Sequence, residues 1–186
     1  LRRQRQMCIR DSHKGKRMIP VAVNLSRMDL MNSRLMERIC TELQETKVPK
    51  QYFRYEIIES AYTIISKEGE EFLKRLRKEG VQIFLDDFGT GYSSLDILKA
   101  LPADWIKIDQ SFVMQVSENK IDRDILKHLS DLCHSLKIKI CVEGVENEES
   151  LNIIEKYLPD TVQGYHYSTP LPETDFFESF ITDKSY

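Results

Sequence analysis

Short apolar runs alternate along this chain with longer amphipathic stretches, and this alternation limits the fold more than any other feature. Six runs are rich in the β-branched and aromatic residues that strands favour, at 21–25, 53–58, 82–86, 105–108, 138–142 and 161–163. The stretches 30–45, 61–79 and 121–136 carry apolar residues at three- and four-residue intervals, which predicts helices. Strands that alternate with helices predict a parallel sheet with right-handed crossovers. The fold class is therefore α/β.

Two architectures fit this alternation, a TIM-like (β/α) barrel and an open doubly wound sheet. Neither a GxGxxG fingerprint nor a P-loop follows the first apolar run, so a dinucleotide-binding fold has little support. We predict the barrel. From Pro20 onward no linker rich in proline, glycine or serine divides the chain. With 186 residues, 41% of them hydrophobic, we expect one globular domain.

Charge and hydropathy exclude several classes of protein. The formal net charge of −3 argues against binding a nucleic-acid polymer through many phosphate contacts. No apolar run approaches the roughly 20 residues of a membrane helix, and no secretory signal is present. We expect a cytoplasmic domain with no membrane contact from this segment. The four cysteines, Cys8, Cys40, Cys133 and Cys141, have no zinc-site spacing, so we expect buried free thiols.

The segment 1–12 differs from the rest of the chain, because it is rich in arginine and has no apolar period. One back-translation of residues 7–11 is ATG TGT ATA AGA GAC, which resembles a transposon end used in sequencing libraries. We predict that 1–12 is a non-native read-through segment and that the domain comprises residues 13–186. The alternative is a natural basic linker. Removing the segment's four arginines and one aspartate takes the net charge from −3 to −6.

Polar side chains stand at the C-terminal end of every predicted strand. In a parallel barrel these ends converge on one mouth, which is where barrel enzymes carry their active sites. Several carboxylates there repel one another unless a cation lies between them. Mg²⁺ or Mn²⁺, with oxygen ligands, would satisfy them. The candidates are Asn24, Glu56, Glu59, Asp86, Asp87, Lys107, Asp109, Glu143 and Gln163.

Each candidate also has a purely structural interpretation. Asn24 alone could cap a helix, and Asp86 with Asp87 could be loop acids before a glycine turn. The recurrence at six strand ends favours a site. Lys107 has Trp105, Ile106 and Ile108 around it, which indicates a buried strand. Beside the acids, Lys107 is the one cation well placed to meet a phosphoryl oxygen or to hold a water nucleophile.

The strings VAVNLS, YEIIES, LDDFGTGYSSL, WIKIDQSFV, VEGVE and QGYHYSTPLP, in this order and spacing, resemble the EAL-domain family of cyclic di-GMP phosphodiesterases. The resemblance runs from about residue 19 to 181. It implies a TIM-like barrel that hydrolyses cyclic di-GMP to linear pGpG, using water activated between two Mg²⁺ or Mn²⁺ ions. It also implies a possible homodimer, because the DFGTGYSS loop is implicated in metal binding and dimerisation.

The resemblance also assigns roles to the candidates. Asn24, Glu56, Asp86 and Asp87 look like the family's metal ligands, and Lys107 looks like its catalytic lysine. Glu143 matches the glutamate of the EGVE segment, a metal ligand or a group that positions water. Glu59 resembles the glutamate that anchors the DFGTGYSS loop. Asp109 completes the KID string, and Gln163 matches the glutamine of QGY.

Two departures from the family pattern matter. Ile58 stands where the family usually has threonine, although both flanking glutamates remain. The chain contains no Glu-Ala-Leu, the motif that names the family and supplies a further metal-binding glutamate. We expect the chain to begin after that strand and the barrel to be incomplete at its N-terminal side. We therefore expect residues 13–186 expressed alone to be poorly soluble or inactive toward cyclic di-GMP, and an upstream segment carrying that strand to restore a soluble, active enzyme.

Two other functions compete with the phosphodiesterase. A degenerate EAL module could bind cyclic di-GMP or a protein partner without turnover. Inactive members usually lose acids or the loop string, and this chain retains both, which favours the enzyme. An unrelated metal-dependent barrel enzyme would have to reproduce every motif by chance.

Overall fold

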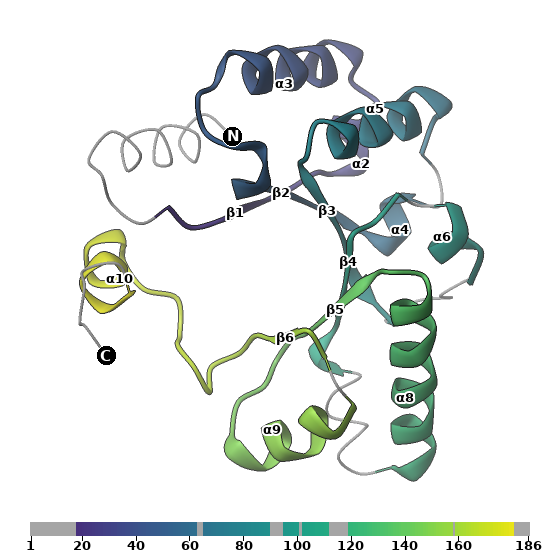
Figure 1. Ribbon diagram of the computed structural model, residues 1–186, viewed down its shortest axis with the longest axis vertical. Helices are drawn as coiled ribbons and strands as arrows, with labels where there is room; N and C mark the ends of the chain where they lie inside the picture. Colours follow the sequence, from purple (N-terminus) through teal and green to yellow (C-terminus); the bar gives the residue numbers. More distant parts are fainter. Residues whose placement is uncertain are drawn as a thin grey trace.

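The computed structural model describes residues 18–62, 65–89, 95–100, 102–111, 119–157 and 159–180. Its six strands form one parallel sheet in the order β1-β2-β3-β4-β5-β6, so that strand order equals chain order. A doubly wound sheet would reverse its order at a switch point. The predicted α/β fold is confirmed as an incomplete barrel, an arc with β1 and β6 at its edges (Figure 1). The strands are β1 Val21–Asn24, β2 Phe53–Ile58, β3 Gln82–Phe88, β4 Trp105–Ile108, β5 Lys139–Val142 and β6 Thr161–Val162.

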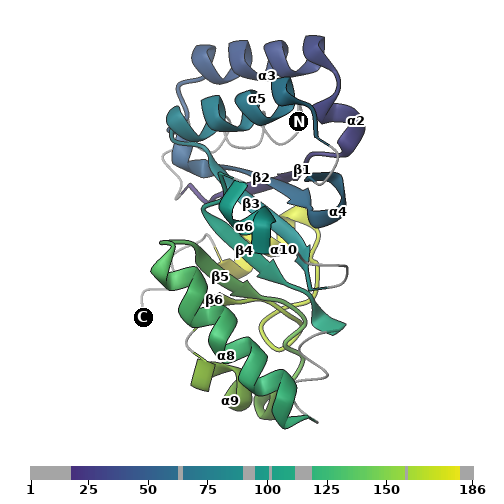
Figure 2. The same cartoon turned by 90° about the vertical axis from the view of Figure 1, so that its right-hand side faces the viewer.

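The helices α3, α5, α6 and α8 lie along the convex side of the sheet, whereas α10 lies on the concave side (Figures 1 and 2). Among the described residues, no helix has both the length and the apolar character needed to cross a membrane. The predictions made for residues 1–12, Cys8 and loop residues 90–94 fall outside the described ranges. The helices are α2 Arg27–Leu30, α3 Ser33–Glu45, α4 Glu59–Tyr62, α5 Lys67–Lys78, α6 Leu95–Ala100, α8 Lys120–Ser135, α9 Glu148–Ile154 and α10 Glu173–Phe180, with 3-10 turns at Lys50–Tyr52 and Glu155–Tyr157.

Two of the three predicted helices were wrong in their extent. The stretch 30–45 divides between α2 and α3, and Asn32 caps α3 by accepting a hydrogen bond from the amide of Leu35. The stretch 61–79 divides between α4 and α5, and Ser66 caps α5 by accepting from the amide of Gly69. Asn and Ser side chains satisfy the first amides of a helix, so they begin a new helix where the apolar period alone suggested continuity.

The third predicted helix is present as α8, but its apolar stripe is only partly buried. Leu126 and Cys133 pack against the sheet. Ile121, Ile125 and Leu136 are exposed. The period of a helix tells which residues share a face, but not how much of that face its neighbours cover.

The main hydrophobic core lies between the convex face of the sheet and its helices. Alternate strand residues point into it, and Ile57, Ile83, Leu85, Ile106 and Ile140 are almost completely buried there. The residues between them point to the concave side, so this alternation places the polar strand residues opposite the main core. Of the predicted buried thiols, Cys40, Cys133 and Cys141 are confirmed as buried and free.

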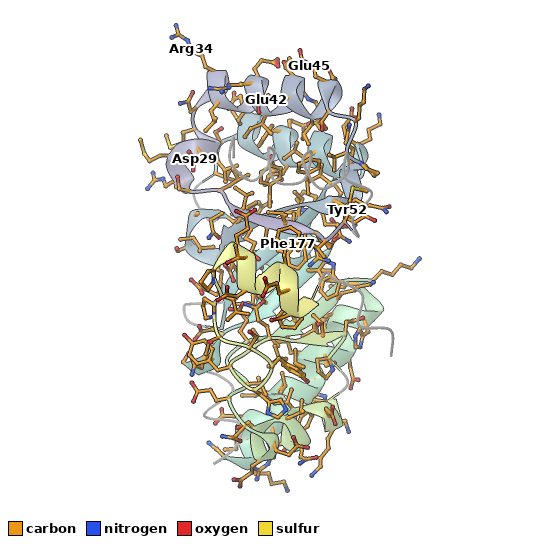
Figure 3. The ribbon with its side chains drawn as sticks, turned by 90° about the vertical axis from the view of Figure 1, so that its left-hand side faces the viewer. Asp29, Arg34, Glu42, Glu45, Tyr52 and Phe177 are labelled. Carbon is orange, nitrogen blue, oxygen red and sulfur yellow. The ribbon has the colours of Figure 1, made fainter. Side chains whose placement is uncertain are left out.

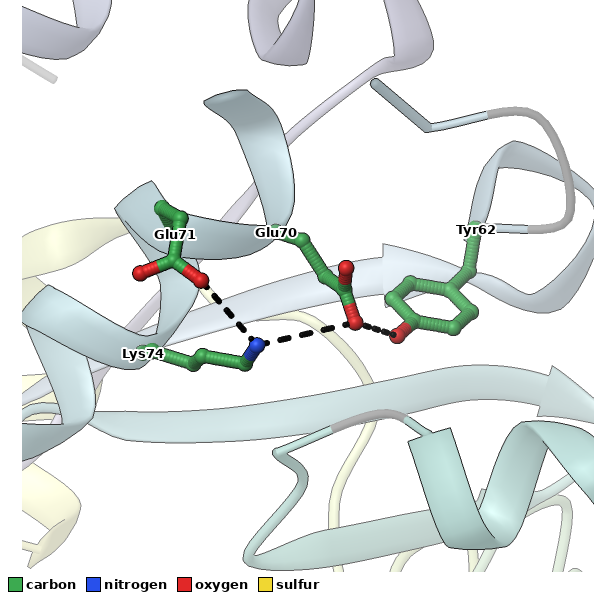
Figure 4. Close-up of polar contacts among 4 residues, drawn as sticks. All are labelled: Tyr62, Glu70, Glu71 and Lys74. Carbon is green, nitrogen blue, oxygen red and sulfur yellow. Dashed lines mark hydrogen bonds and ion pairs between the residues drawn. The ribbon is translucent and has the colours of Figure 1, made fainter. Parts of the chain in front are cut away.

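The short helix α4 is tied to α5 by a polar cluster. The hydroxyl of Tyr62 donates to Glu70 Oε1 at 3.4 Å, and Lys74 Nζ lies 3.2 Å from Glu71 Oε1 (Figure 4). Burial, together with the negative charge of Glu70, raises the pKa of Tyr62 to about 12. The hydroxyl therefore keeps its proton at neutral pH and remains a donor. This contact joins α5 to α4, whose first residue is the site candidate Glu59.

Near the N-terminal ends of the strands, two aspartate side chains accept hydrogen bonds from amides of neighbouring strands. Asp104, just before β4, accepts from the amide of Ile83 through Oδ2 at 3.0 Å and from Arg77 Nε through Oδ1 at 2.8 Å. Just before β6, Asp160 accepts from the amide of Ile140 through Oδ2 at 2.9 Å, and His134 lies 3.1 Å from the same oxygen. Each aspartate thus supplies an acceptor to a strand amide near the N-terminal end of the neighbouring strand.

We expect Asp104→Ala to lower the free energy of unfolding by about 1–3 kcal/mol, because the buried amide of Ile83 loses its acceptor. Arg77→Ala is the matched control, since it removes only the half-exposed ion pair and should cost less than about 1 kcal/mol. Urea denaturation of both variants measures the difference. Equal losses of unfolding free energy in the two variants would show that the hydrogen bond from the Ile83 amide to Asp104 does not add to stability.

Candidate metal and phosphodiester site

The candidate site occupies the C-terminal part of the concave face. Strand residues that alternate with the buried core residues point there, and among them Glu56, Lys107 and Cys141 line one cavity of about 640 Å³. Lys107 on β4 lies beside Cys141 on β5 in the strand register. Asn24 lies beside Glu56 in the same way. The parallel register therefore brings residues that are far apart in sequence to one level of the arc.

Lys107 is the centre of the site. Its ammonium nitrogen lies 2.8 Å from Glu143 Oε1, 2.9 Å from Asp86 Oδ1 and 3.2 Å from Glu56 Oε1. The lysine is 6% exposed, which confirms that it is not a surface residue. One positive charge meets three carboxylates, so the ionised group carries a net charge of −2.

The pKa shifts of Lys107 and of the acids near it agree with this surplus of negative charge. Burial alone would lower the pKa of Lys107, but its hydrogen bonds to Glu143 and Asp86 outweigh burial and raise that pKa above its ordinary value. Burial raises the pKa of Glu143, although Lys107 opposes the shift. Burial and the charge of Asp86 raise the pKa of Asp87. Negative charge therefore exceeds what one ammonium compensates.

Asp86 and Asp87 converge because β3 carries a bulge. Leu85 pairs with Ile106 and Phe88 pairs with Ile108, so β3 holds one more residue than β4 between these pairs. Asp87 has a φ of +56°, a backbone conformation that aspartate tolerates better than most residues. Successive side chains of a regular strand point to opposite faces, and a bulge redirects one of them. The bulge thus lets two consecutive carboxylates face the same site.

The donors fit a hard divalent cation. Oxygens of Asp86, Asp87 and Glu143 lie within 4.8 Å of one another, and carboxylate oxygens are the ligands that Mg²⁺ and Mn²⁺ prefer. Within the described ranges this is the single group of three such residues. Glu56 on β2 also contacts Lys107, and the exposed Asn24 on β1 pairs with Glu56 in the strand register. A second ion between them stays a prediction.

The three supporting candidates take different positions. Glu59 is buried, and its Oε2 accepts from the amide of Gly89, the first residue after β3, at 3.5 Å. Asp109 accepts from the amide and hydroxyl of Ser111, and the side-chain hydrogen bond to Ser111 lowers its pKa. Gln163 is exposed and lines the cavity. Asp109 therefore caps the start of the helical residues 110–111 and is not one of the clustered carboxylates.

Part of the lining of this cavity was not predicted from the sequence. Arg54, Phe84 and Trp105 line it, each two residues before a site residue on its own strand. The rings of Phe84 and Trp105 stack with centroids 5.3 Å apart, and the guanidinium of Arg54 lies 5.3 Å from the Phe84 centroid. The two-residue period of a strand was the signal that could have identified them. The helix α10, which carries Phe177, crosses the open side of the arc (Figure 3).

Two curated relatives match most of the chain. NbdA, a cyclic di-GMP phosphodiesterase of Pseudomonas aeruginosa, is 34% identical over 158 residues, which cover 85% of this chain and 20% of NbdA. PdeB, a cyclic di-GMP phosphodiesterase of Shewanella oneidensis, is 34% identical over 162 residues, which cover 87% of this chain and 19% of PdeB. The chain thus spans about a fifth of the length of these relatives.

Solved structures share the fold. The EAL domain of Mycobacterium smegmatis DcpA has a TM-score of 0.82 and 30% identity, covering 93% of this chain and 79% of that one. The PaMucR phosphodiesterase of Pseudomonas aeruginosa, in a c-di-GMP complex, has a TM-score of 0.76 and 31% identity, with coverages of 84% and 64%. Klebsiella pneumoniae BlrP1, in a calcium and cyclic di-GMP complex, has a TM-score of 0.71 and 25% identity, with coverages of 78% and 37%.

The family model for the EAL domain matches residues 3–170. That match begins within the segment 1–12, whose non-native origin stays a prediction. It spans all six strands and every site candidate. The chain therefore belongs to the EAL domain family.

Proposed function

We propose that this chain forms the metal- and phosphate-binding side of a phosphodiesterase that hydrolyses cyclic di-GMP to linear pGpG with Mg²⁺ or Mn²⁺. The observation that carries the proposal is the buried Lys107 ammonium inside a group of carboxylates with surplus negative charge. A purely structural ion pair would need one acid for one base. Three acids around one lysine leave capacity for a further cation.

The carboxylates of Asp86, Asp87 and Glu143 would hold the cation on one side of the cavity. When bound, a divalent cation supplies a nucleophilic water at neutral pH and stabilises charge on phosphoryl oxygens. The Lys107 ammonium contacts Asp86, Glu143 and Glu56, and from this position it can donate hydrogen bonds to a phosphate oxygen or hold the attacking water in place. Glu143 accepts from Lys107 and can orient that water.

The substrate assignment rests on three supports. The cavity volume of about 640 Å³ lies within the range of small-molecule sites. NbdA and PdeB are cyclic di-GMP phosphodiesterases, and the PaMucR and BlrP1 structures contain cyclic di-GMP. The clustered acids cannot bind a phosphodiester directly, so the cation and Lys107 would supply the positive charge that an anionic substrate needs.

We expect Asp86→Asn to lower the Mn²⁺ affinity of the chain by at least about 10-fold, because a charged ligand becomes neutral at constant volume. Titration calorimetry measures this on the 186-residue chain. Asp131→Asn, on the exposed face of α8, is the matched control and should bind Mn²⁺ as the parent does. Equal Mn²⁺ affinity in the parent and Asp86→Asn would contradict the metal assignment.

The same pair of variants tests turnover when the chain is preceded by a strand carrying Glu-Ala-Leu. Formation of pGpG should fall about 10²–10³-fold in Asp86→Asn and stay at the parental rate in Asp131→Asn. Binding of cyclic di-GMP without any pGpG from the extended parent would instead identify a sensor module.

We expect Lys107→Met to affect metal binding and turnover in opposite directions. Removing the ammonium leaves the carboxylates without their internal cation, so Mn²⁺ should bind more tightly and should raise the melting temperature more than in the parent. Turnover of the extended chain should still be lost, because no ammonium meets the phosphate. Thermal melting with and without Mn²⁺ measures the first effect, and weaker Mn²⁺ binding in Lys107→Met would contradict it.

A further inference from the structure

The turn that follows Glu143 is enclosed by Gln110 on one side and by the start of the QGY segment on the other. Glu143 comes directly after β5, and its amide donates to the carbonyl of Ile108 at the end of β4 at 3.0 Å. Gly144 then takes a φ of +72°, which lets the chain turn away from the strand direction. The main chain on both sides of the Glu143 side chain is thus constrained.

Gln110, two residues after β4, closes the turn from one side. A Cβ atom on Gly144 would overlap Cβ and Cγ of Gln110, so the glutamine stem lies directly against the glycine. The Gln110 side chain extends past it, and Nε2 donates to Glu146 Oε1 at 2.9 Å. One residue therefore contacts the turn at its glycine and at its last carboxylate.

The start of the QGY segment closes the turn from the other side. The amide of Val145 donates to the carbonyl of Gln163 at 3.2 Å, and the amide of His166 donates to the carbonyl of Val145 at 3.0 Å. Gly164 lies so close that a Cβ there would overlap the main chain of Val145. Val145 itself is completely buried. This side is held by backbone contacts, so Gln110 is the side-chain contact that a substitution can change selectively.

We propose that Gln110 is a positioning residue, whose contacts with Gly144 and Glu146 fix the turn and thereby hold the Glu143 carboxylate in the metal site. The inference rests on the proposed function for its last step. Residues that orient a metal ligand through a hydrogen bond typically change metal affinity by about 10- to 100-fold when they are removed. Gln110 reaches Glu143 through the main chain of the turn, so we expect the lower end of that range.

A reversal of the hydrogen bond provides the test. Gln110→Glu places two carboxylates face to face, so it should speed amide exchange in residues 144–146 of the metal-free chain and weaken Mn²⁺ binding by about 10-fold. The double variant Gln110→Glu with Glu146→Gln has the parental net charge and restores an amide-to-carboxylate hydrogen bond in the opposite direction. It should return both the exchange rate and the Mn²⁺ affinity to parental values. The measurements are hydrogen exchange by mass spectrometry and titration calorimetry.

Parental exchange and affinity in Gln110→Glu would overturn the proposal. So would a loss of affinity in Gln110→Glu that the double variant does not reverse, because the effect would then not pass through the Gln110–Glu146 contact. If the parent chain binds no Mn²⁺, the metal site of the proposed function fails. The exchange rates then still decide whether Gln110 holds the turn, so the two failures are distinguishable.

Discussion

The ammonium of Lys107 is the contact on which the arrangement of this site depends. It lies within 3.2 Å of carboxylates from β2, β3 and the end of β5, so one side chain links three strands at their C-terminal ends. Without it, the three carboxylates would repel one another with no positive charge among them. With it, the group keeps its shape and still carries surplus negative charge. A divalent cation would use that charge, and the lysine would then be available to a phosphate oxygen.

The rest of the fold keeps these groups in place. The core on the convex side fixes the strands, so the alternating concave residues have little freedom to move apart. Asp104 and Asp160 accept hydrogen bonds from strand amides near the N-terminal ends of the strands, away from the candidate site at the C-terminal ends. This division, with stabilising contacts at the N-terminal ends and the candidate site at the C-terminal ends, matches the usual plan of a barrel enzyme.

The sequence predicted the strands and the position of the site at their C-terminal ends. Both rest on local signals, namely apolar runs of period two and polar residues where each run ends. It did not predict the bulge at Asp87, since no glycine marks the positive φ there. The helix breaks at Asn32 and Ser66 were detectable as capping residues, but the apolar period continued across them. The Gln110–Glu146 contact joins residues 36 positions apart, and only the packing of neighbouring strand ends reveals it.

The central claim is tested most directly by crystals of the chain grown with Mn²⁺. Anomalous diffraction recorded for manganese would locate the ion in the crystal structure. The arrangement around Lys107 predicts an anomalous peak at about 2.1 Å from oxygens of Asp86, Asp87 and Glu143. It also predicts that the Lys107 ammonium moves away from at least one carboxylate that the ion engages. Saturating Mn²⁺ with no peak at these oxygens, and with Lys107 still bound to all three carboxylates, would contradict the claim that the surplus charge is a metal site.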